Sequence, residues 1–147
     1  MKKLLLSLIL GSLLCGTAAF ADDMAKQRMK IIHHTNPLPN LMQVIIKKGD
    51  ELNLSEEQAK ALKGWHSENS PRIMQDAKQI MAVEKKLHDE ALAGASGDEL
   101  QKLADESFRL RMEIMKIKLA CRNNMHQVLK KDQWDKLLKL YAAMNSK

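Results

Sequence analysis

The residues from Ser96 to Val128 read SGDELQKLADESFRLRMEIMKIKLACRNNMHQV. Apolar and small residues recur along this stretch three and four positions apart, which is the spacing of one face of an α-helix. The residues on this face are Leu103, Ser107, Leu110, Ile114, Ile117, Cys121 and Val128. Ser96 and Glu99 match a capping box, in which two side chains satisfy the free amides of a helix start. The stretch is therefore predicted to be one long helix, with a seam along which a second helix packs.

A second apolar face lies on the far side of the same predicted helix. Basic residues flank it, and positions 109–131 hold seven basic residues and one acidic residue, whereas positions 84–106 hold seven acidic and three basic residues. An apolar face that remains after a hairpin core is built must be covered by a partner or used for binding. We therefore predict a binding surface, with a subunit interface as the alternative. Its residues are Phe108, Arg111, Met112, Met115, Lys118, Leu119 and Arg122.

The segment before this helix carries a second capping box at Ser55 and Gln58, and it ends at a turn around Gly94. Pro71 is expected to kink this helix or to split it, with Ser70 as a new cap. Shorter helices are predicted from Leu38 to about Gly49 and from 131 to 144. The expected fold is all-α, a long antiparallel hairpin with short flanking helices in one domain over 37–147. The helix that begins after Ser96 is expected to be the longest.

The first 21 residues have the pattern of a secretory signal peptide. Lys2 and Lys3 precede an apolar run over 4–14 that is too short to span a bilayer, and Ala19-Phe20-Ala21 resembles a cleavage site. We expect cleavage after Ala21, a flexible N-terminal arm over 22–36, and no stable membrane insertion. Because two lysines leave with the signal, the formal net charge of +6 falls to +4.

Composition and motifs argue against catalysis and against nucleic-acid binding. Aromatic residues make up only 3% of the chain, whereas single-strand nucleic-acid binders stack bases on aromatic side chains. The chain lacks a glycine-rich phosphate loop and an HExxH motif, and no nucleophile motif surrounds its serines. We therefore expect a protein that is not an enzyme, needs no cofactor and has no nucleic-acid partner.

Cys121 is the only thiol that remains after the signal is removed, because the other cysteine is Cys15. A lone exported cysteine indicates intermolecular pairing, a soft-metal ligand or a buried thiol. Cys121 with Met125 one turn later, or His33 with His34, can bind soft cations such as Cu(I). The position of Cys121 on the seam favours a buried thiol, and the two histidines are not spaced like a zinc site. A metal site at these four residues is the alternative hypothesis.

Two short sequences, over 54–58 and 129–133, resemble the paired LTxxQ motifs of the Spy/CpxP family of periplasmic stress proteins. They lie about seventy residues apart, as the hairpin of that family requires, and the resemblance covers about 38–144. The motif residues with an expected structural role are Leu54, Ser55, Gln58, Leu129 and Gln133. Ser55 and Lys130 replace the threonines of the motif, and lysine cannot accept a hydrogen bond from a helix amide, so a weaker second cap is expected.

The resemblance implies a thin, curved, all-helical homodimer in the periplasm. Spy-like members are ATP-independent chaperones that hold unfolded or misfolded envelope proteins on a concave face, and CpxP-like members also dampen a stress-sensing kinase. A related branch, similar to CnrX, senses heavy metals. The expected function is therefore a periplasmic chaperone or envelope-stress adaptor, and the alternative is heavy-metal binding or sensing.

Overall fold

The computed structural model describes residues 38–145, which are almost entirely helical and contain no strand. The predicted signal peptide and N-terminal arm lie outside these residues. Within 38–145, four α-helices and one 3-10 helix follow each other in the order α2 (Leu41–Lys48), η1 (Gly49–Leu52), α3 (Glu56–Ala93), α4 (Gly97–Val128) and α5 (Lys131–Asn145). The expected all-α hairpin with short flanking helices is confirmed.

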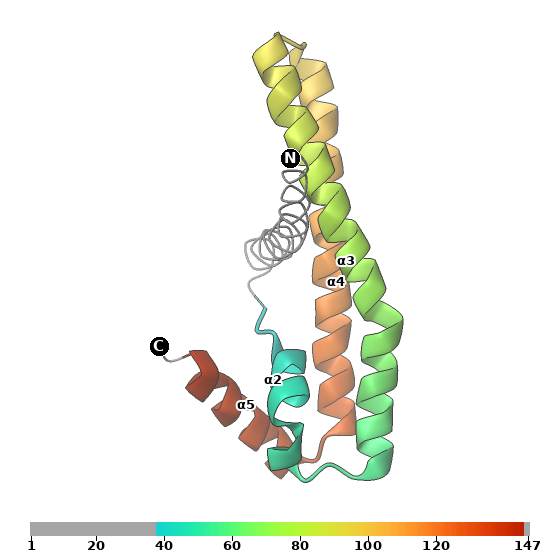
Figure 1. The fold of residues 1–147 in the computed structure, drawn as a ribbon, viewed down its shortest axis with the longest axis vertical. Helices are drawn as coiled ribbons and strands as arrows, with labels where there is room; N and C mark the ends of the chain where they lie inside the picture. The colour runs from blue at the N-terminus through green and yellow to red at the C-terminus, as the bar shows by residue number, and fades with distance from the viewer. Residues whose placement is uncertain (1–37, 146–147) are drawn as a thin grey trace, which may run out of the picture.

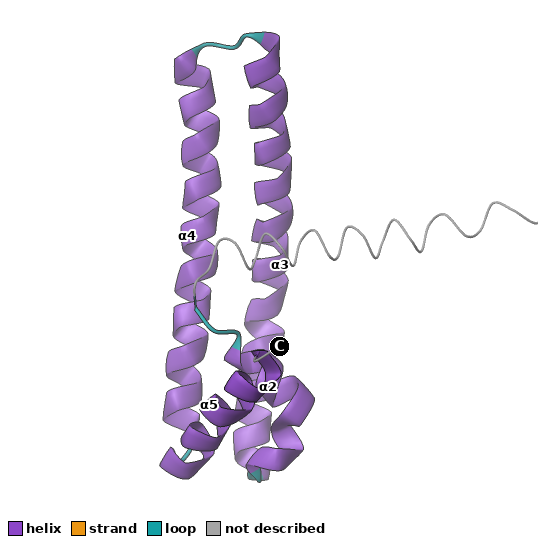
Figure 2. Cartoon of the chain, turned by 90° about the vertical axis from the view of Figure 1, so that its left-hand side faces the viewer, coloured by secondary structure: helices purple, strands orange, loops and turns teal. Residues whose placement is uncertain are grey.

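Helices α3 and α4 form the long antiparallel hairpin, and they lie side by side along their length (Figures 1 and 2). At 1.5 Å per residue they are about 57 and 48 Å long. Gly94 ends α3 with a left-handed φ of 83°, which glycine adopts without a steric penalty. Both predicted capping boxes are present, at the starts of α3 and α4. These local signals place the turn and both helix starts.

Pro71 lies inside α3 and does not split it. Of the two effects expected of Pro71, a kink or a split with a new helix start at Ser70, the split is wrong. The expectation that α4 is the longest helix is also wrong, because α3 has 38 residues and α4 has 32. Proline has no amide hydrogen, so the carbonyl of Ser67 loses its normal helical partner. Both residues are exposed, where water can satisfy that carbonyl. Packing of the next turns of α3 against α4, through Ile73 and Ala77, keeps the helix continuous.

The interior of the described part of the chain is divided into two apolar clusters. The smaller one lies in the middle of the hairpin and consists of Ala77, Ile80, Leu110 and Ile114. The larger one fills the base, where α2, η1 and α5 pack across the ends of the hairpin. Its buried members are Leu41, Met42, Val44, Leu52, Leu62, Cys121, Met125, Leu129 and Leu137. The predicted seam of α4 is thus confirmed, since its residues are buried or half-buried.

None of the helices over 38–145 combines the length and the apolar composition that crossing a bilayer requires.

Candidate functional site

The second apolar face of α4 is open to solvent along its middle. Phe108 is 67% exposed, Met112 55% and Leu119 45%, and Met115 between them is half-buried. We call these four residues the α4 stripe. The opposite face of the same helix is buried against α3, with Leu110 and Ile114 at or below 2% exposure. The hairpin therefore holds the stripe on a rigid support, and the described residues leave it uncovered.

Two basic residues beside the α4 stripe, Arg111 and Arg109, are engaged within the chain itself. The guanidinium of Arg111 donates to the carboxylate of Glu84 on α3 and, over 3.3 Å, to the hydroxyl of Ser107. Arg109 makes two hydrogen bonds of 2.8 and 2.7 Å to Glu106 on its own helix. Arg111 thus links the two helices of the hairpin, a role that sequence periodicity did not indicate.

Two further predicted cations lie near the base of the hairpin. Arg122 stands 5.5 Å from the ring centre of Trp134 on α5, and His126 approaches the same ring edge-on at 4.9 Å. Lys118 is half-buried next to Cys121, and loss of water lowers the pKa of its amine. The structure therefore brings the predicted cations beside the stripe but gives most of them other contacts. The apolar side chains carry most of the free binding capacity.

The two motif glutamines, 75 positions apart in sequence, meet at the base of the hairpin. The side-chain amide of Gln58 donates to Gln133 Oε1 over 2.8 Å, and Gln133 donates back to Gln58 Oε1 over 3.1 Å. We call this arrangement the amide pair. Gln58 also donates to the carbonyl of Val128 over 2.8 Å. Gln133 donates to the carbonyls of Leu52 and Asn53 over 3.3 and 3.1 Å.

Each motif glutamine also caps its own helix. Gln58 Oε1 accepts from the amide of Ser55 over 3.0 Å, and the Ser55 hydroxyl accepts from the amide of Gln58 over 3.2 Å. At the second motif, Gln133 Oε1 accepts from the amide of Lys130 over 2.9 Å. One of the two hydrogen bonds of a capping box is therefore present at Lys130, because that bond needs only the backbone amide of this residue. Leu54 is half-buried and Leu129 is buried beside these caps. The five motif residues form one structural unit.

The surroundings of Cys121 do not favour a metal site. Burial raises the pKa of its thiol to about 11, despite the nearby charge of Lys118. The thiol is therefore protonated at neutral pH, whereas metals bind the thiolate. Met125 is buried in the same cluster, and His33 and His34 lie outside the described residues. Over 38–145, no three His, Cys, Asp or Glu side chains gather in a way that could hold a metal ion.

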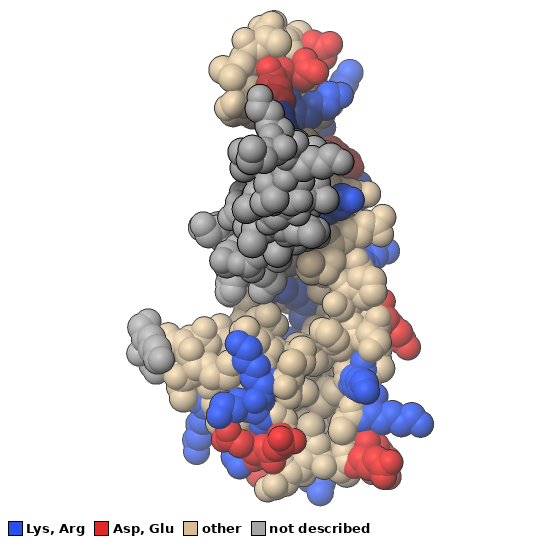
Figure 3. All heavy atoms as spheres, in the orientation of Figure 1, with Lys and Arg blue, Asp and Glu red and all other residues tan. Residues whose placement is uncertain are grey.

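Charged side chains of both signs surround the lower end of the molecule, where α2 and α5 pack (Figure 3). Lys48 pairs there with Glu51 over 2.8 Å, and Lys131 pairs with Asp135 over 2.7 Å. Uncharged surface lies between these groups in the same view. On the face seen in Figure 3, the base therefore carries uncharged surface between charges of both signs.

Comparison with known protein families, with curated proteins and with solved structures finds no match to this chain.

Proposed function

We propose that this protein is a periplasmic, ATP-independent chaperone that holds unfolded or misfolded envelope proteins on the α4 stripe. The observation that carries the proposal is the exposure of Phe108, Met112 and Leu119 on a helix whose opposite face is buried. Large apolar side chains that form a row on a soluble surface are typical of interaction sites.

The chemistry of the α4 stripe suits clients of varied sequence. Methionine side chains are flexible and polarizable, so they adapt to differently shaped apolar segments. Covering one partly exposed side chain of this kind is worth about 1–2 kcal/mol. A client therefore binds through several weak contacts and can leave without ATP. The net positive charge of the chain attracts acidic clients over longer distances.

The paired motifs support the rest of the proposal. They resemble those of the Spy/CpxP family, and the amide pair gives both of their glutamines a structural role. We extend the proposal to a curved homodimer, in which two stripes bind one client more tightly than either stripe alone. In a related form of this function, the protein acts as an adaptor that binds a stress-sensing kinase through the same surface and lowers its activity.

The double variant Met112→Glu/Met115→Glu tests the proposal in an aggregation assay with a chemically unfolded client. Acids on the α4 stripe should abolish suppression of light scattering at stoichiometric protein, while circular dichroism and sedimentation stay unchanged. Leu92→Glu is the matched control, because Leu92 is an exposed apolar residue near the tip of the hairpin. It should keep full activity.

Three results would contradict the proposal. The wild-type protein could fail to suppress aggregation, or the double variant could keep its activity. The double variant could also become monomeric or unfold, because unpaired carboxylates buried in an interface cost several kcal/mol. That result would reassign the α4 stripe to the contact between subunits.

A further inference from the structure

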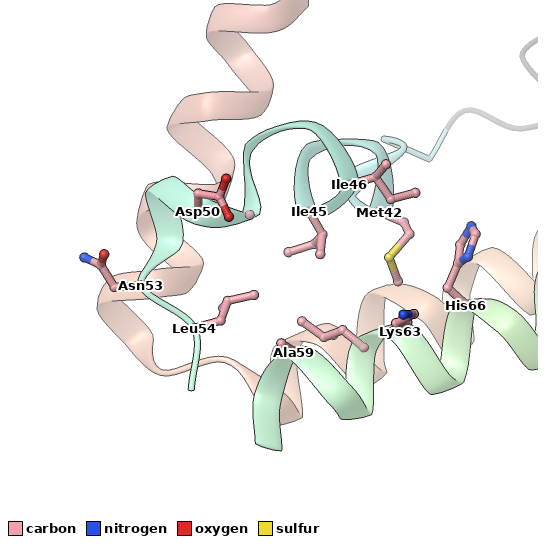
Figure 4. Close-up of a pocket in the computed structure, with 11 residues that line it drawn as sticks. Met42, Ile45, Ile46, Asp50, Asn53, Leu54, Ala59, Lys63 and His66 are labelled. Carbon is pink, nitrogen blue, oxygen red and sulfur yellow. The ribbon is translucent and has the colours of Figure 1, made fainter. Parts of the chain in front are cut away.

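A groove of about 550 Å³ lies between α2 with η1 on one side and the first turns of α3 on the other. It is separate from the α4 stripe, because no residue of α4 lines it. In Figure 4 the side chains of Met42 and Ile45 point from α2 toward α3, and Leu54 closes the groove from the connecting loop. The middle of the groove is therefore apolar.

The rim of the groove contains an apolar residue that the fold itself does not bury. Ile46 is 64% exposed, although Leu62 at the floor of the groove is 1% exposed. On the α3 side of the groove, opposite Ile46, the lining residue Ala59 has only a small side chain and does not cover Ile46. A ligand that lies in the groove can thus cover Ile46 without displacing the buried cluster below.

The two ends of the groove differ in charge. Lys63 and His66, one turn apart on α3, stand at one end, and Asp50 of η1 stands at the other (Figure 4). Within 38–145 no ion pair joins Lys63 or His66 to a carboxylate. An anionic group is therefore attracted to the end with Lys63 and repelled from the end with Asp50.

The volume of the groove indicates what kind of ligand it takes. Ligand pockets commonly enclose about 300–1,000 Å³, with apolar walls and a few polar groups that set the orientation. A single flexible chain is much narrower than an α-helix, which is at least about 10 Å wide with its side chains, and a chain of this kind fits along the groove.

We propose that this groove binds a single-chain amphiphile with a carboxylate head, the chemistry of a free fatty acid. The chain lies along Met42, Ile45 and Leu54 and covers Ile46, and the carboxylate lies at Lys63. This binding does not depend on the proposed chaperone function, because the two surfaces use different elements.

Calorimetric titration of the purified protein with dodecanoate, below its micelle concentration, tests the proposal. We expect one saturable site per chain. Dodecyltrimethylammonium and dodecanol carry the same chain with a cationic and a neutral head, and the cation should bind at least tenfold more weakly than dodecanoate. Lys63→Glu and Ile46→Asp should each weaken dodecanoate binding at least tenfold. The control Leu92→Asp changes an aliphatic residue that is also exposed but lies far from the groove, and it should have no effect.

Several outcomes would overturn the proposal. Absence of saturable dodecanoate binding would remove the site, and equal affinity for the three head groups would remove the role of Lys63. A loss of binding in Leu92→Asp as large as that in Ile46→Asp would show adsorption to the general surface. If Ile46→Asp does not fold by circular dichroism, Lys63→Glu decides, because Lys63 is exposed. Lys63→Glu should also keep its activity against client aggregation, which separates this site from the α4 stripe.

Discussion

Replacing Gln133 by alanine should lower the free energy of unfolding more than the same replacement at any other glutamine in the described part of the chain. Its residue is 6% exposed, and its side chain bonds to the backbone of Leu52, Asn53 and Lys130 as well as to Gln58. Gln133→Ala removes all of these partners at once. Three backbone groups are left in partly or fully buried positions, and at about 1 kcal/mol net for each lost hydrogen bond the cost is about 3 kcal/mol.

Chemical and thermal unfolding followed by circular dichroism measures this cost. For a chain of this size, a loss of about 3 kcal/mol lowers the melting temperature by about 10 °C. Gln58→Ala should also destabilise, and the double variant should lose about 1 kcal/mol less than the sum, since the two amides share a hydrogen-bonded pair. Gln79→Ala, an exposed position on α3, is the control.

Gln133→Glu separates the donor role of the side chain from its acceptor role. The carboxylate still accepts from the amide of Lys130, but it faces the carbonyls of Leu52 and Asn53 with no hydrogen to donate. Those oxygens raise the pKa of the introduced carboxyl in the folded state above its unfolded value, about 4.3. The destabilisation is therefore full at neutral pH and shrinks as the pH falls toward 4. A cost below about 0.5 kcal/mol for Gln133→Ala, or strict additivity with Gln58→Ala, would refute the reasoning.

Three further variants probe the hairpin. Pro71→Ala restores an amide hydrogen to the interior of α3 at an exposed position, and it should stabilise the protein by about 1–3 kcal/mol in urea unfolding. A loss of stability instead would mean that the proline shapes the packing of the hairpin. Cys121 should react slowly with iodoacetamide at pH 8. Because burial raises the pKa of its thiol from the ordinary value of 9.0 to about 11, the free energy of unfolding should fall from pH 9 to 11. Cys121→Ala should remove that fall, whereas rapid labelling of the native protein would contradict the buried position. Asp76→Ala should stabilise by about 1 kcal/mol, since Oδ2 is buried without a hydrogen bond and the nearest cation, Arg72 Nε, is 3.8 Å away. Destabilisation would show that Asp76 has a partner that this chain does not supply.

Local sequence signals predicted the helix starts and the turn of the hairpin. The caps at Ser55 and Ser96 and the left-handed Gly94 each depend on residues within four positions, so a short stretch of sequence determines them. The burial of Leu110 and Ile114 was predicted for the same reason, because helical spacing alone assigns them to one face.

The features that the sequence did not predict depend on contacts between distant residues. Arg111 was placed on the flank of a binding surface, but Glu84 on the other helix of the hairpin engages it. The contact between Gln58 and Gln133 depends on how α5 folds back across the base, and no local rule contains that information. The prediction for Pro71 used only the intrinsic tendency of proline to break a helix. The packing of α3 against α4 overrides that tendency.

The amide pair has a mechanical consequence for the hairpin. The turn at Gly94 joins α3 and α4 covalently at one end, and Gln58 bonds to Val128 and Gln133 at the other. Because α3 and α4 are joined at both ends, they cannot slide past each other freely. A shift by one helical turn of about 5.4 Å would first have to break the hydrogen bond from Gln58 to the carbonyl of Val128. Any flexing of the hairpin must then be a shared bend of both helices. Such a bend is easiest near Pro71, where α3 lacks one backbone hydrogen bond.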